Sequence, residues 1–174
     1  KKFDAALAKG DIEGVLKLFA KECYWRDFLT FTWNLKTAES KDDIAAMLKA
    51  TLKRTKPANW QIEGEASRAG DITEAWITFE TKAARSRGHL RLNGSKCWTL
   101  LTTMVELKGH EEKKGPKRAL GAEHGVVPER KNWLERRKQE AEELGYKTQP
   151  YVVIVGGGQG GIALGARLRR LGVP

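Results

Sequence analysis

Three glycines near the end of the chain have the spacing of a phosphate-binding turn. Gly156, Gly158 and Gly161 fit the pattern G-x-G-x-x-G. In such a turn the first glycine allows a sharp change of direction, the second lets a pyrophosphate approach the backbone, and the third lets a helix pack closely on a strand. The free N–H groups at the start of that helix then face the phosphate charges. The spacing alone is a weak signal, so the neighbouring residues decide its meaning.

The residues on both sides of the glycines favour this interpretation. Residues 151–155 read Tyr-Val-Val-Ile-Val, which is typical of a buried strand, and residues 162–168 form an apolar helical pattern with small side chains. The alternative, a flexible glycine linker, is disfavoured because linkers rarely lie between such elements. The acid that binds the ribose is expected about 20 residues further on, which falls past Pro174. We therefore expect only the first strand, turn and helix of a dinucleotide-binding domain here, with weak binding by this chain alone.

Candidates for acid–base catalysis are weaker. Tyr24, Asp27 and His89 are residue types that a pocket catalyst needs, but no local spacing brings them together. Asp27 beside Arg26 is typical of a surface ion pair, and His89 of an ordinary strand residue. The catalytic residues therefore stay unknown, with these three as pocket candidates.

The two cysteines, Cys23 and Cys97, have no Cys or His neighbour at metal-ligand spacing, so the sequence predicts no metal site. They indicate reduced thiols in a cytoplasmic protein, although one long-range disulfide stays open.

The composition fits a folded protein with a charged surface. Hydrophobic residues make up 40% of the chain, and the net charge is +10. The basic residues alternate with acids, which favours a solvated surface over a nucleic-acid face. The most apolar stretch is short and rich in glycine, so no membrane span is predicted. We interpret the tryptophans as core residues, and a cage of aromatic rings around a ligand is the less favoured alternative.

The periodicity predicts helices first and strands afterwards. Residues 3–20 and 40–56 have helical patterns, with Asp11 and Ser40 as capping residues. After Pro57 the pattern alternates, with turns at 70–71 and 93–94 and a central strand over 97–105. A short strand at 23–25 is predicted to break at Arg26. This order indicates an α+β fold in which helices cover a curved antiparallel sheet, closing a cone around a pocket.

The chain divides into three predicted segments. Residues 1–108 form the cone domain, residues 109–149 form a basic linker and a connector helix from Pro128 to Leu144, and residues 150–174 begin the dinucleotide-binding domain. Because an open sheet face tends to be covered, we expect a homodimer that forms through the cone domain. Both ends of the chain are expected to be cut.

The sequence resembles a known family over nearly its whole length. Residues 150–174, PYVVIVGGGQGGIALGARLRRLGVP, are similar to the FAD-binding start of flavin-containing monooxygenases, and residues 128–150 resemble their connector. The stretch CYWRDFLTFTWNLKTAESKDDIAAML is similar to nuclear transport factor 2-like (SnoaL-like) domains. The resemblance implies a full-length enzyme that uses FAD and NAD(P)H to oxidise a small-molecule substrate. It also implies that six residues of the turn hold the FAD pyrophosphate: Gly156, Gly157, Gly158, Gln159, Gly160 and Gly161.

Two other functions stay open. The cone could be a module that binds a small ligand or forms a dimer, or it could be a stand-alone enzyme such as a dehydratase or isomerase. On the flavoprotein interpretation, the chain itself is an inactive fragment of an oxidoreductase, since it lacks the NAD(P) domain and a substrate-oxidation site.

Overall fold

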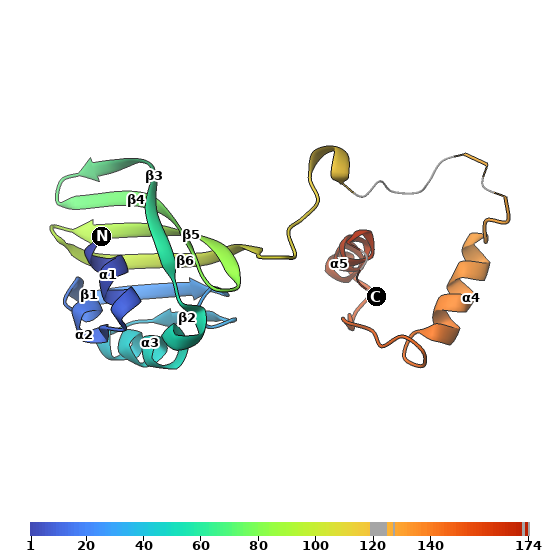
Figure 1. The fold of residues 1–174 in the computed structure, drawn as a ribbon, viewed down its shortest axis with the longest axis horizontal. Coiled ribbons are helices and arrows are strands. Elements are labelled where there is room, and N and C mark those ends of the chain that lie inside the picture. The colour runs from blue at the N-terminus through green and yellow to red at the C-terminus, as the bar shows by residue number, and fades with distance from the viewer. Residues whose placement is uncertain (119–124, 127, 172, 174) are drawn as a thin grey trace. The chain divides into compact units, whose positions relative to one another are not determined.

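The structure, a computed structural model, describes residues 1–118, 125–126, 128–171 and 173. The chain divides into two compact units, Lys1–Glu111 and Glu112–Pro174 (Figure 1), which are described separately. The predicted division into three segments is finer than this and stays a prediction. The part of the predicted linker at 119–124 and 127 lies outside the described residues.

A six-stranded sheet forms the first unit. Its strands are β1 (Phe19–Phe28), β2 (Leu35–Ala38), β3 (Ala58–Ala69), β4 (Ile72–Glu80), β5 (Ala84–Asn93) and β6 (Lys96–Leu107). Its strands lie in the order β2-β1-β6-β5-β4-β3, so β6 is central, as predicted. All neighbours are antiparallel except β1 and β6, which run parallel. The α+β class is therefore confirmed, but the prediction of a purely antiparallel sheet is wrong. The physical reason is the long connection through β2, helix α3 (Lys41–Thr55) and the strands β3, β4 and β5, which returns the chain beside β1 in the same direction.

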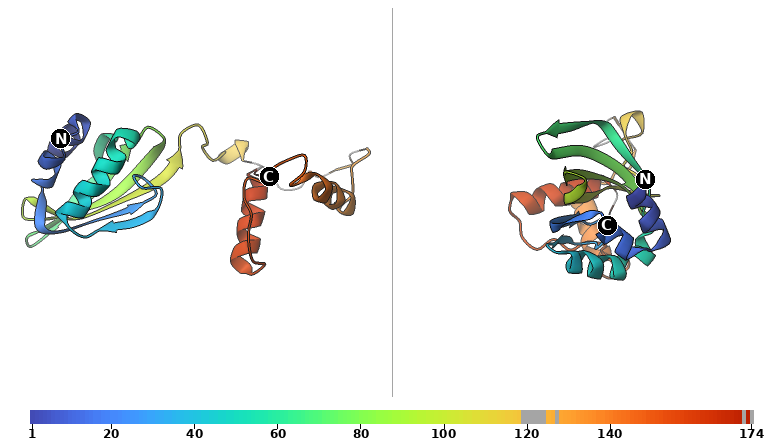
Figure 2. Two further views of the ribbon diagram at one scale, coloured as in Figure 1. Left: turned by 90° about the horizontal axis from the view of Figure 1, so that it is seen from below. Right: turned by 90° about the vertical axis from the view of Figure 1, so that its left-hand side faces the viewer.

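Three helices lie on one side of this sheet: α1 (Lys2–Lys9), α2 (Ile12–Leu16) and α3 (Lys41–Thr55) (Figure 2). The helical pattern predicted over 3–20 is split because Gly10, at φ +70°, ends α1. The Asp11 carboxylate then accepts the Gly14 N–H and caps α2, as predicted. The Ser40 side chain caps α3 by accepting the Asp43 N–H, which confirms the second predicted helix.

The predicted break of the first strand at Arg26 is wrong. β1 continues through Arg26 and Asp27 to Phe28, because the alternation puts Arg26 outside and Asp27 inside the cone. The two predicted turns are confirmed, with Gly70 and Gly94 both at positive φ. The short strand β2 was not predicted.

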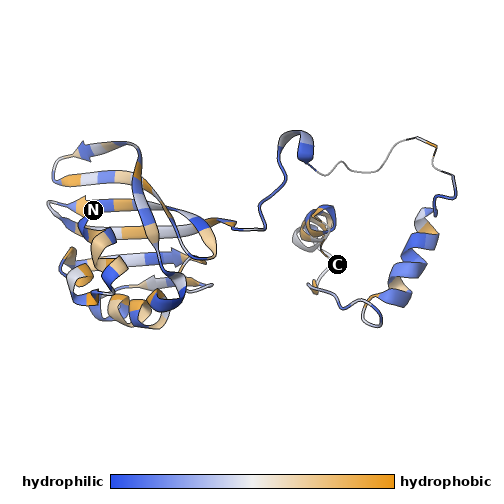
Figure 3. Ribbon diagram, in the orientation of Figure 1, coloured by the Kyte–Doolittle hydropathy of each residue, from blue (hydrophilic) through white to orange (hydrophobic). Residues whose placement is uncertain are grey.

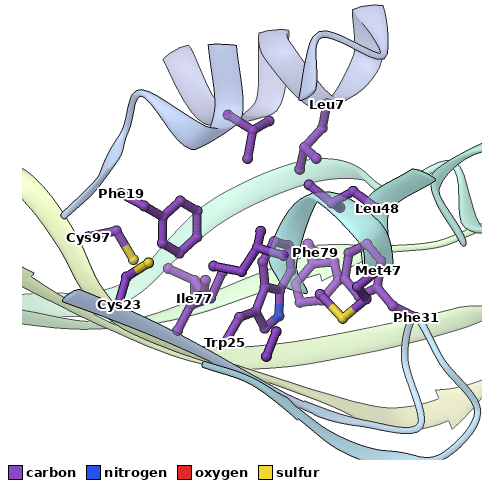
Figure 4. Packing of buried hydrophobic residues seen from close by; sticks show 14 residues of the cluster. Leu7, Phe19, Cys23, Trp25, Phe31, Met47, Leu48, Ile77, Phe79 and Cys97 are labelled. Carbon is purple, nitrogen blue, oxygen red and sulfur yellow. The ribbon is translucent and has the colours of Figure 1, made fainter. Parts of the chain in front are cut away.

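Aromatic rings fill the space between helices and sheet (Figure 4). Trp25 is fully buried, stacks with Phe19 at 6.0 Å and meets Phe31 edge-on at 5.1 Å. This confirms Trp25 as a core residue. By contrast, Trp33 and Trp76 are 51% and 41% exposed, so the interpretation of all tryptophans as core is too broad.

The second unit contains the 3-10 turn η1 (Gly115–Lys117) and the helices α4 (Trp133–Glu143) and α5 (Gln159–Arg170). α4 begins five residues later than predicted, because Asn132 and Glu135 form a reciprocal capping box there. Its surface is mainly hydrophilic (Figure 3).

The strand predicted over 151–155 is not observed. These residues form no strand, and Val153 and Val155 are 76% and 96% exposed. A single β-type segment has no ladder without a neighbouring strand, and the described part of this unit supplies none. The Rossmann-like β-α unit is therefore reduced to a glycine turn followed by α5.

None of the helices among the described residues is long and apolar enough to span a bilayer.

Candidate functional site

A cavity of about 300 Å³ lies in the first unit, between α1 and the inner face of the sheet. That volume is at the lower end of the range typical of small-molecule sites. Most of its lining is apolar, and the indole of Trp60 on β3 and the thiol of Cys97 on β6 belong to it. Five further polar side chains also belong to the lining: Lys1, Lys2, Asp4, Gln61 and Ser95. The apolar lining consists of Phe3, Leu18, Ile62, Ile77, Leu90, Leu92 and Leu100.

A local irregularity of β3 positions the Trp60 ring. The pairing of β3 with β4 shifts by one residue between Ala58 and Gln61, and Asn59 lies there at φ +60°. Such a bulge re-aims side chains, and Asn tolerates this conformation better than most residues. The Trp60 ring stacks on Phe79 at 3.8 Å with an interplanar angle of 3° and meets Phe3 edge-on at 5.1 Å.

The Trp60 Nε1 is buried and has no hydrogen-bond partner among the described residues. Because a buried indole N–H normally finds an acceptor, this donor is an unmet polar group within a side chain that lines the cavity. Sequence reasoning missed this role. The sequence does carry a faint signal, since Pro57 and Asn59 interrupt the strand pattern just before Trp60.

Asp27 is fully buried, and its carboxylate is occupied by hydrogen bonds. It accepts the Phe31 N–H at 3.0 Å, the Thr32 N–H at 2.9 Å and the Thr32 hydroxyl at 2.8 Å. On its other oxygen it accepts the Thr102 hydroxyl at 2.7 Å, and Thr102 Oγ1 itself accepts the Trp25 indole N–H at 2.9 Å. This carboxylate therefore organises a loop and two strands, and the interpretation as a surface pair with Arg26 is wrong.

The structure does not bring the three pocket candidates together. Tyr24 and His89 lie on the outer face of the sheet, opposite Asp27, as the strand register shows. The Tyr24 hydroxyl donates to the Glu22 carboxylate at 3.1 Å, and that hydrogen bond and charge raise the pKa of Tyr24. His89 lies between Trp76, at 4.7 Å from ring to ring, and Glu74, at 3.4 Å. The three residues therefore form no acid–base site.

No group of three or more His, Cys, Asp or Glu side chains within the described ranges could hold a metal ion.

Cys23 and Cys97 are both buried free thiols, and Figure 4 shows their sulfur atoms pointing toward one another. Burial, and to a smaller degree the nearby Cys23, raises the pKa of Cys97 to about 12. Burial likewise raises the pKa of Cys23, so neither thiol suits a nucleophile at neutral pH.

The glycine turn of the second unit keeps part of the expected geometry. Gly156 lies at φ +114°, and a side chain at Gly161 would collide with the Gly156 carbonyl oxygen. α5 starts directly after Gly158, and added side chains at 157, 158 and 160 would meet nothing within 4 Å. The turn is thus open on one side and close-packed at its third glycine. Whether it binds FAD stays a prediction.

Comparisons with known proteins concern the fold. No protein-family model matches the chain, and a comparison with curated proteins finds no match. Similar solved structures include a domain of unknown function with a cystatin-like fold from Nostoc punctiforme, at 14% identity and a TM-score of 0.49, covering 60% of this chain and 71% of that one.

A second is the Orange Carotenoid Protein of Anabaena binding canthaxanthin, at 16% identity and a TM-score of 0.48, covering 60% of this chain and 35% of that one. A third, from Catenulispora acidiphila, has a ketosteroid isomerase-like fold and was solved with trimethylamine. It has 17% identity and a TM-score of 0.46, and the match covers 60% of this chain and 82% of that one. Nothing in these comparisons supports a flavin monooxygenase, and the function has to come from this chain's own geometry.

We predict that Asp27→Ala lowers the free energy of unfolding by about 3–4 kcal/mol, because several buried donors lose their acceptor. Thr102→Val should cost about 1–2 kcal/mol, since it leaves the Trp25 N–H without an acceptor and removes one of the donors to the Asp27 carboxylate. Urea unfolding followed by circular dichroism measures both. The exposed substitution Glu65→Ala is the control and should stay within about 0.5 kcal/mol. If Asp27→Ala behaves like the control, the carboxylate does not organise the fold.

A second prediction concerns stability at alkaline pH. Because the folded-state pKa of Cys97 is about 12 and its ordinary value is 9.0, the unfolded thiol ionises first as the pH rises. The stabilising contribution is therefore complete below about pH 9 and is lost progressively toward about pH 12, by up to about 1.4 kcal/mol per pH unit. Urea unfolding at a series of pH values between these limits should show a smaller decline for Cys97→Ala than for the unmodified chain. Equal declines would contradict the assignment.

Proposed function

We propose that the first unit is a binding module for a small, mainly apolar molecule that carries one hydrogen-bond acceptor. The observation that carries this proposal is the Trp60 side chain, which lines a mainly apolar cavity of about 300 Å³ and whose buried N–H has no partner among the described residues. Apolar walls with few polar groups are typical of sites that recognise a small molecule by shape and orient it by one contact.

The cavity walls support binding more than catalysis. Asp27 does not belong to the lining, its four donor groups come from the protein itself, and Cys97, which does belong to the lining, keeps its proton at neutral pH. Asp4 on α1 is the one carboxylate among the described residues of the lining. Trp60 can donate a hydrogen bond but cannot act as an acid or base at ordinary pH. The arrangement therefore fits a carrier or sensor of a neutral apolar ligand better than a dehydratase or isomerase.

The experiment compares two ligands of similar shape, 2-acetonaphthone and 2-ethylnaphthalene, by isothermal titration calorimetry. The ketone should bind up to about tenfold more tightly, because only its carbonyl accepts the Trp60 N–H. Trp60→Phe keeps the ring beside Phe79 and should abolish this preference, leaving the hydrocarbon affinity almost unchanged.

Two further variants define the site. Leu92→Trp fills the cavity and should abolish binding of both ligands, whereas Leu35→Trp, at a side chain that is 59% exposed, should change neither. If the ketone has no advantage, or if Trp60→Phe keeps it, the hydrogen bond is not part of recognition. If neither ligand binds the unmodified chain, the cavity is not a binding site.

A second candidate function is supported by the glycine turn. We propose that the turn is the diphosphate-binding end of an FAD site in a longer oxidoreductase that also uses NAD(P)H, with 156–161 around the pyrophosphate. The fit rests on two observations. At position 161 only glycine fits beside the Gly156 carbonyl oxygen, and the space around Gly157, Gly158 and Gly160 is open. A bound flavin would supply the redox chemistry, and these residues would hold and orient it.

This second proposal is tested with ADP, which carries the same diphosphate. Weak, about millimolar binding should shift the amide NMR signals of 156–161, because only the turn is present. Gly161→Ala should abolish these shifts through its clash with Gly156, while the matched control Gly160→Ala should keep them. The visible absorption of protein isolated from its natural source reports bound flavin directly. Unaltered ADP shifts in Gly161→Ala would contradict the assigned geometry.

A further inference from the structure

A second hollow of the first unit, separate from the apolar cavity, has a strongly basic lining. Its volume is about 550 Å³, and it lies at the C-terminal end of α3. Four cationic side chains line it, and no carboxylate is among the described residues that do so. Exposed Trp33 lies in the same lining. The cations are Lys53, Arg54, Lys56 and Lys82.

The number of cations is large in relation to the whole unit. Residues 1–107 contain 18 Lys and Arg against 14 Asp and Glu, a net charge of +4. The four cationic side chains at this hollow therefore equal in number the net positive charge of residues 1–107. On the outer face of the sheet, by contrast, arginines are paired with glutamates, as in Arg87 with Glu63 and Arg91 with Glu74.

Three elements that border the hollow are joined by hydrogen bonds. The Arg54 guanidinium donates to the Phe31 carbonyl at 3.2 Å, which ties α3 to the loop between β1 and β2. The Lys82 N–H donates to the Thr55 carbonyl at 2.7 Å, which ties the β4–β5 turn to the end of α3. The site is therefore built in advance, so a ligand would not have to order it.

Backbone conformation gives a further indication. Leu29, Trp33 and Lys56 lie at φ +66°, +56° and +46°, and all three belong to the loop or the helix end at this hollow. Non-glycine residues in the left-handed region persist only where the surrounding structure holds them, and they cluster at ligand sites. The Asp27 hydrogen bonds to Phe31 and Thr32 supply that support for the loop.

Compensation of the helix dipole explains only part of this charge. Lys53 and Arg54 lie in the last turn of α3, where cations are ordinarily favourable. Lys56 and Lys82 lie outside the helix, and the end carbonyls of Leu52 and Thr55 already accept the N–H groups of Lys56 and Lys82. The two outer lysines are therefore available for a bound anion.

We propose that this hollow binds a small organic anion with an aromatic ring, its oxyanion held by the cations and its ring against Trp33. Arg and Lys are the side chains that recognise phosphate and carboxylate groups, and an indole face accepts a flat apolar ring. The proposal does not depend on the function assigned to the apolar cavity.

The test is an NMR titration of the full chain with phenyl phosphate, benzoate, inorganic phosphate and benzyl alcohol. The two aromatic anions should shift the amide signals of 30–33, 53–56 and 81–84 and bind more tightly than inorganic phosphate or the neutral alcohol. Their relative affinities distinguish a phosphate ligand from a carboxylate. Equal affinity for inorganic phosphate, or shifts confined to other residues, would overturn the proposal.

Matched variants separate charge from stacking. Lys56→Asn with Lys82→Gln should lower the affinity for phenyl phosphate by about tenfold or more, and asparagine suits the left-handed backbone at 56. Lys49→Gln removes a charge from the same helix outside the hollow and should change nothing. Trp33→Ala should reduce the affinity for phenyl phosphate to that for inorganic phosphate. Leu92→Trp, in the other cavity, should leave binding intact. An unchanged affinity in the double variant would refute the site.

Discussion

The buried carboxylate of Asp27 is the interaction on which most of the first unit depends. It lies on β1, bonds to Thr102 on β6 and holds the N–H groups of Phe31 and Thr32 in the following loop. A buried charge is tolerated only when it is fully hydrogen-bonded, and here the donors come from two strands and a loop. These bonds fix the parallel pair β1 and β6 at the centre of the sheet and direct the loop back into the cone.

Both candidate sites follow from that constraint. The loop held by Asp27 places Phe31 in the core, where it touches Trp25 and Phe79, and Phe79 in turn stacks with Trp60 beside the apolar cavity. The same loop presents its Phe31 carbonyl to Arg54 and carries Trp33 at the basic hollow. One buried side chain thus links an interior suited to a neutral ligand with a rim suited to an anion.

The second unit illustrates how much a sequence motif depends on its partners. The glycines form a turn with the close approach at Gly161 that a diphosphate site needs, and α5 follows as predicted. The preceding valines do not form a strand, because a strand is defined by its neighbours and the described residues offer none. The homodimer and the cytoplasmic location likewise stay predictions. Trp76, Leu35 and Val105 are exposed on the outer face of the sheet. Exposed apolar side chains of this kind are typical of a surface that binds a partner, and the structure does not identify that partner.

Features that arise within a few residues could be predicted from the order of the amino acids alone. Ser40 and Asp11 marked helix starts, Gly70 and Gly94 marked turns, and alternation marked the strands that follow Pro57, because capping, positive φ and side-chain period act within a few residues. Three features became evident only in the folded chain. The strands β1 and β6 run parallel, Asp27 lies inside and not on the surface, and Trp60 lines a cavity while Trp33 lies at the basic hollow. Those outcomes depend on contacts between segments far apart in the chain, such as Asp27 with Thr102 and Lys82 with Thr55, and no local pattern encodes them.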